Sequence, residues 1–111
     1  MPSGTVDITR YEVDIISNVG PNPARVRLYR PNGSLAVIMS FFEPDRIPRD
    51  NDAPLNFPAT GFARVNYPIS ALAPVIDILR NEKPIYFQWI TLERPYGYLT
   101  TSAEPVGEGE I

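Results

Sequence analysis

The stretch that decides the fold is 25-RVRLYRPNGSLAVIMSFF-42. Asn32 and Gly33 separate two runs rich in β-branched, aromatic and aliphatic residues. Both residues tolerate a positive φ, so this pair is the strongest short-range signal for a β-hairpin. The second run, residues 35–42, carries apolar side chains at both parities. This pattern predicts a central strand that is covered on both faces or buried in an interface.

Outward from this hairpin, period-two patterns predict further strands over residues 5–17, 61–67, 85–92 and 98–103. The apolar positions change parity between residues 8 and 11, which predicts a bulge or kink there. A stripe at Leu72, Val75, Ile76 and Leu79 predicts one helix over residues 70–82. Residues 43–58 hold four prolines and no periodicity, so this long segment is interpreted as a loop with functional or mobile character.

The element order is therefore β-β-β, long loop, β-α-β-β. It predicts an α+β fold, in which a curled antiparallel sheet of five or six strands packs against one helix. We expect a single domain over residues 1–103 and a flexible acidic C-terminal tail over residues 104–111. One helix cannot cover both faces of such a sheet. We therefore expect the sheet to curl, or its apolar surface to meet a second copy of the chain.

Composition excludes several classes of function. The 111 residues include no cysteine and no histidine, so disulfides, cysteine nucleophiles and histidine-dependent catalytic triads are excluded within this chain. The net charge of −3 comes from the last eight residues, because residues 1–103 carry ten acids and ten bases. A neutral body offers no general attraction for duplex DNA or anionic membranes. No apolar run could span a bilayer and no secretory signal is visible, so we expect a cytoplasmic protein.

One strand face is the first candidate site. Its ligand-binding candidates are Arg25, Arg27 and Tyr29, extended by Arg64 and by Arg10 if their strands pair suitably. Arginines and an aromatic ring on one strand face are typical of sheets that bind single-stranded nucleic acid. The alternative is an ordinary solvent face, on which these arginines pair with Glu12 and Asp14 across strands.

A second candidate surface is aromatic. Tyr86, Gln88, Tyr96 and Tyr98 lie on the two late strands and are candidates for a protein interface, where tyrosine is enriched. The alternative is cross-strand packing within a hairpin. We expect the neighbouring Phe87 and Trp89 to lie in the core.

The long loop carries the remaining chemistry. Its carboxylates Glu43, Asp45, Asp50 and Asp52 are the candidates for a hydrolase that uses a carboxylate pair. The run Asp50-Asn51-Asp52 resembles the start of a calcium loop but lacks the later glycine and glutamate, so we expect no metal site and no cofactor.

Together these observations predict a non-enzymatic cytoplasmic binding or assembly module. Its expected partner is a second copy of itself, with another protein partner possible and no membrane. The alternatives are a single-stranded nucleic-acid binder and a carboxylate-based hydrolase.

Overall fold

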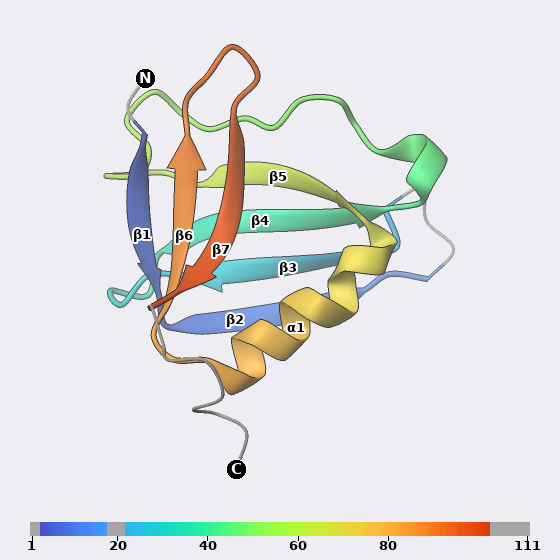
Figure 1. Ribbon diagram of the computed structural model, residues 1–111, viewed down its shortest axis with the longest axis horizontal. Helices are drawn as coiled ribbons and strands as arrows, with labels where there is room; N and C mark the ends of the chain where they lie inside the picture. Colours follow the sequence, from blue (N-terminus) through green and yellow to red (C-terminus); the bar gives the residue numbers. More distant parts are fainter. Residues whose placement is uncertain (1–2, 18–21, 103–111) are drawn as a thin grey trace.

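A computed structural model describes residues 3–17 and 22–102 and shows seven strands and one α-helix (Figure 1). The strands are β1 (Gly4–Ile8), β2 (Arg10–Ile15), β3 (Ala24–Tyr29), β4 (Leu35–Phe42), β5 (Ala63–Pro68), β6 (Ile85–Ile90) and β7 (Tyr96–Thr101). The helix α1 (Leu72–Asn81) follows the 3-10 turn η2 (Ile69–Ala71), and a second such turn, η1 (Pro44–Arg46), follows β4.

The strands form two sheets. One is antiparallel with three strands in the order β1-β6-β7, and the other has four strands in the order β2-β3-β4-β5. Within the second sheet β4 and β5 run parallel. The α+β class is thus confirmed. The expectation of one curled, wholly antiparallel sheet of five or six strands is wrong.

The chain changes from one sheet to the other at Thr9. The predicted long strand over residues 5–17 is two strands, because β1 pairs with β6 whereas β2 pairs with β3. The Thr9 N–H donates to the Tyr29 carbonyl at 3.0 Å, where the chain passes from one sheet to the other. The change of parity between residues 8 and 11 therefore marks a change of sheet rather than a bulge within one strand.

The second sheet supplies the cover that one helix cannot give. In Figure 1, β1, β6 and β7 cross steeply over the four-stranded sheet, and α1 lies on the same side of it. Val75 and Leu79 of α1 join one core cluster with side chains from both sheets. Phe87 and Trp89 of β6 are fully buried in that cluster, as expected. One face of the four-stranded sheet is closed in this way, while its other face is open to solvent at several positions.

The connection from β4 to β5 is fastened at two points. Phe57 is fully buried and meets the rings of Phe87 and Trp89 edge to face, with centroid distances of 6.4 and 5.8 Å. Arg30, in the β3–β4 hairpin, donates to the carbonyls of Pro58 and Gly61 at 3.1 and 2.7 Å. This segment, which sequence periodicity left unassigned, therefore closes one end of the core.

Within the described residues, no helix is long and apolar enough to cross a membrane. The predicted acidic tail, residues 104–111, lies outside those residues.

Candidate functional site

The predicted arginine row lies on the open face of the four-stranded sheet. Arg25, Arg27 and Tyr29 alternate along β3 with fully or almost fully buried residues, so they point away from the core. Arg64 of β5 lies on the same face, because Ile38 of β4 pairs with Arg27 on one side and with Arg64 on the other. The four candidates therefore share one surface, which we call the arginine face, with β4 between Arg64 and the other three.

Two acids of β2 engage most of this row. Asp14 accepts from Arg25 Nε at 2.9 Å and from Arg27 at 3.2 Å, and Glu12 lies 3.7 Å from Arg27. The Tyr29 hydroxyl donates to Glu12. These contacts follow from the register, because Glu12 stands opposite Arg27 and Asp14 opposite Arg25. Arg25 and Arg27 thus pair across strands with acids of β2, as the solvent-face alternative predicts.

The electrostatics of the face reflect these contacts. The hydrogen bond from Arg25 favours the charged form of Asp14 and holds the pKa of that carboxyl below its ordinary value. Donation to Glu12 raises the pKa of Tyr29, because loss of the phenolic proton would break that bond. At neutral pH both contacts are therefore in their hydrogen-bonded states.

Two other arginines on this sheet are stacked on rings. Arg10 lies over Tyr29 with its guanidinium carbon 4.5 Å from the ring centroid, and Arg64 lies 5.1 Å from the centroid of Phe62. Within residues 3–17 and 22–102, the ion pairs to acids involve Arg25 and Arg27 alone. Arg10 and Arg64 therefore keep their charge available to an added anion.

The predicted aromatic surface is also brought together. Tyr86 and Gln88 of β6 stand opposite Thr100 and Tyr98 of β7, and Tyr96 continues the row beyond them. All four candidates lie on the face of the three-stranded sheet that points away from the core, and we call this the tyrosine face. Tyr96 and Tyr98 are each 43% exposed and stack with a centroid distance of 6.3 Å. The predicted cross-strand packing and an accessible aromatic surface therefore coexist.

The loop carboxylates lie at the protein surface. Glu43, Asp45, Asp50 and Asp52 are all exposed, and Asp52 pairs through its backbone with Arg64 at the margin of β5. In the described part of the chain, no group of three or more acids is placed to hold a metal ion. Carboxylate hydrolysis stays a prediction that this geometry does not favour.

One surface was not predicted from the sequence: the free edge of β2. The Ile16 N–H donates to the Pro23 carbonyl at 2.8 Å, and antiparallel ladders alternate hydrogen-bonded and non-hydrogen-bonded pairs. Residues 12 and 14 therefore bond to β3, whereas the N–H and C=O groups of Tyr11, Val13 and Ile15 point outward. Val13 and Ile15 are also 37% and 72% exposed. The alternation of RYEVDI predicts a strand, but no local signal indicates that it lies at an edge.

No family model, no curated protein and no solved structure matches this chain.

Proposed function

We propose that the protein is a non-enzymatic, cytoplasmic binding and assembly module that forms a homodimer through the edge of β2. The observation that carries the proposal is the outward backbone of Tyr11, Val13 and Ile15, which no strand within residues 3–17 and 22–102 pairs, beside exposed apolar side chains. Figure 1 shows β2 at the margin of the four-stranded sheet. Such an edge is a template for pairing with another strand.

The β2 sequence favours one antiparallel register. When Tyr11 pairs with Val13 of a second copy, both residues use their outward N–H and C=O groups. The two-fold symmetry of the dimer forms the same pair a second time, between Val13 of the first copy and Tyr11 of the second. In this register Arg10 of each copy stands opposite Asp14 of the other, which gives two attractive pairs. The two Glu12 side chains stand opposite each other, which gives one repulsive pair.

Sliding the register by one pair in one direction places Glu12 opposite Asp14 twice, which is repulsive. Sliding it in the other direction places Val13 opposite Thr9, whose N–H already donates to Tyr29, so fewer backbone bonds form. Charge and the number of backbone bonds together select the first register.

The dimer would be a continuous eight-stranded sheet with β2 at its centre. The contact between two short edge strands is small, so we expect a dissociation constant on the order of 10 µM. Edge pairing leaves the tyrosine face uncovered on both copies. That face is the surface we propose for a different protein partner, because exposed tyrosines are enriched at protein interfaces.

The test is Val13→Pro. The Val13 N–H points away from β3, so proline removes no hydrogen bond within the subunit but removes two from the symmetric dimer. Val13→Thr is the matched control, because it keeps the N–H and the β-branched shape. Sedimentation equilibrium from 1 to about 200 µM, a span set around the expected dissociation constant, should show dimerisation of the native chain and the threonine variant. The proline variant should stay monomeric with unchanged circular dichroism.

A native chain that remains monomeric throughout this range would contradict the proposal. A folded proline variant that dimerises like the native chain would show that another surface is used.

Single-stranded nucleic-acid binding is a second candidate, favoured by the charge of the arginine face. Arg10, Arg25, Arg27 and Arg64 outnumber Glu12 and Asp14, in a chain with net charge −3. Fluorescence anisotropy of a labelled oligonucleotide at low salt measures this binding. Arg64→Gln should weaken it, whereas Arg46→Gln, an exposed arginine of η1, should not. An unchanged anisotropy with the native chain would exclude this function.

A further inference from the structure

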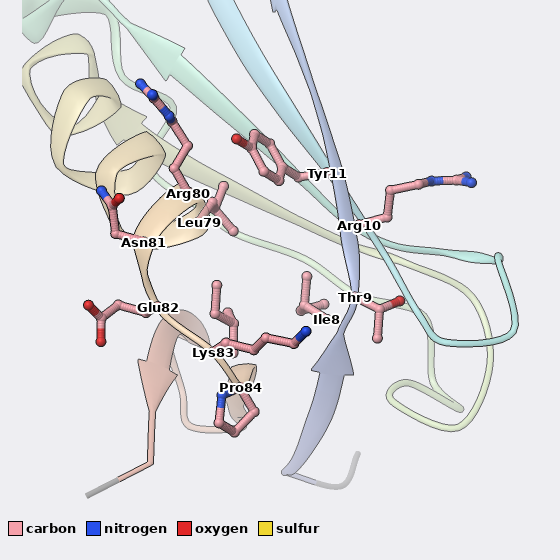
Figure 2. A pocket seen from close by; sticks show the side chains of 11 residues that line it. Ile8, Thr9, Arg10, Tyr11, Leu79, Arg80, Asn81, Glu82, Lys83 and Pro84 are labelled. Atoms are coloured by element: carbon pink, nitrogen blue, oxygen red, sulfur yellow. The ribbon is translucent and has the colours of Figure 1, made fainter. Parts of the chain in front are cut away.

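We propose that the groove between the end of α1 and the bend from β1 to β2 binds a small molecule with an apolar body and a negatively charged head, such as a medium-chain carboxylate. The groove has a volume of about 610 Å³ and is drawn in Figure 2. This size lies within the range of about 300–1,000 Å³ typical of small-molecule sites. The proposal does not rest on the homodimer, because all the lining side chains belong to one subunit.

The inner wall of the groove is apolar. Ile8 of β1, Leu79 of α1 and Ile85 of β6 line it and belong to the hydrophobic core, so they hold a fixed position. Pro84 and the ring of Tyr11 extend this wall on either side. An alkyl chain or a ring laid against these side chains would leave water without disturbing a buried polar group.

The rim of the groove is cationic. Figure 2 shows the Lys83 side chain reaching across toward the bend between β1 and β2, whereas Arg80 lies toward the other end of the groove and directs its guanidinium away from the Lys83 amine. Neither cation takes part in an ion pair among the described residues. Lys83 is also the chain's only lysine.

The acids nearby do not oppose an anion in the groove. Glu82 is the one acid in the lining, and Figure 2 shows its carboxylate pointing to the opposite side from the Lys83 amine. The Arg10 guanidinium points out of the groove and lies over Tyr29 on the arginine face. The head group of the ligand would therefore meet Lys83, while Arg80 and the Tyr11 hydroxyl lie toward the other end of the groove.

Decanoate, titrated as the monomer below its micelle concentration, is the probe. The amide signals of Ile8, Tyr11 and Leu79 should shift with saturation in two-dimensional NMR of the labelled full chain. Because pairs of exposed charges contribute about 0.2–1 kcal/mol, Lys83→Gln should weaken binding about threefold, whereas Arg80→Gln, toward the other end of the groove, should have a smaller effect. Arg46→Gln, an exposed cation far along the chain, should leave the affinity unchanged.

Two further probes separate the head from the body. Decanol, which lacks the charge, should bind more weakly than decanoate and should be insensitive to Lys83→Gln. Butyrate, which keeps the charge, should bind at least about tenfold more weakly, because each buried methylene contributes up to about 0.8 kcal/mol. Absence of saturable shifts at the three amides overturns the proposal. So does equal binding of decanoate and decanol, equal binding of butyrate and decanoate, or a Lys83→Gln variant that binds like the native chain.

Discussion

Gly97 is the position where one added methyl group should do the most harm to this fold. It lies on β7 opposite Trp89, at the point where β7 passes over the ring of Phe87. A Cβ atom at residue 97 would lie 2.1 Å from Phe87 Cζ and within 2.9 Å of both Cε atoms. Real Cβ atoms do not approach other atoms so closely, so the Gly97→Ala variant must move either β7 or the ring.

The ring has little freedom to move. Phe87 is fully buried and is held edge to face against Phe57 at a centroid distance of 6.4 Å. Overpacking of a well-filled core costs about 1–3 kcal/mol, and the rigid surroundings place Gly97→Ala at about 2–3 kcal/mol. Phe87→Leu alone should cost about 1–2 kcal/mol, less than full truncation to alanine. It also opens the space that the new methyl group needs.

A double-mutant cycle measures the interaction energy between residue 97 and the Phe87 ring. If the clash with the ring causes the loss, the Gly97→Ala, Phe87→Leu double variant should be more stable than the sum of the single losses by at least about 1 kcal/mol. Urea unfolding, followed by the fluorescence of the chain's one tryptophan, gives the free energies. Additive losses, or a Gly97→Ala variant as stable as the native protein, would refute the reasoning.

The other predictions concern the β4–β5 connection and the pH dependence of stability. Arg30→Met removes charged donors from the carbonyls of Leu35, Pro58 and Gly61, so the free energy of unfolding in urea should fall by about 2–4 kcal/mol. The control Arg46→Met should change it by less than about 0.5 kcal/mol. Equal effects of the two substitutions would contradict this role of Arg30. Burial raises the pKa of Tyr67 from 10.0 to about 12, because the folded state disfavours the deprotonated form. The contribution of Tyr67 to stability should therefore be constant below pH 10 and fall by about 2–3 kcal/mol as the pH rises toward 12. Tyr67→Phe should flatten that fall, and a native profile that stays level to pH 12 would count against it.

Much of the local structure is predictable because it depends on neighbouring residues. The hairpin around Asn32 and Gly33 and the strand Leu35–Phe42 form where the pattern places them. Parity also correctly groups Arg25, Arg27 and Tyr29 on one face. These features need only the period of a strand and the chemistry of a turn.

The sheet partners were less accessible to the sequence because they are set by contacts distant along the chain. Nothing near Thr9 shows that β1 joins β6, some eighty residues later, while β2 joins β3. The parallel pairing of β4 with β5 depends on a long connection whose anchor, Phe57, is a single apolar residue in a stretch without periodicity. The groove could not be predicted either, since its walls come from four separate elements, β1, β2, α1 and β6.

The division of the N-terminal strand region into β1 and β2, which closes the core, also underlies the proposed assembly. Turning the chain at Thr9 gives the four-stranded sheet a second layer but leaves additional sheet margins. At one margin β1 is crowded by Pro58, since a Cβ on Gly4 would lie 2.6 Å from its ring, and β5 is capped by the pairing of Asp52 with Arg64. β7 is an edge strand as well; its Leu99 packs against the core, and its exposed Tyr96 and Tyr98 belong to the tyrosine face, which we propose for a different partner. β2 combines outward-pointing backbone groups with exposed Val13 and Ile15, and it is therefore the margin that we propose for pairing with a second copy.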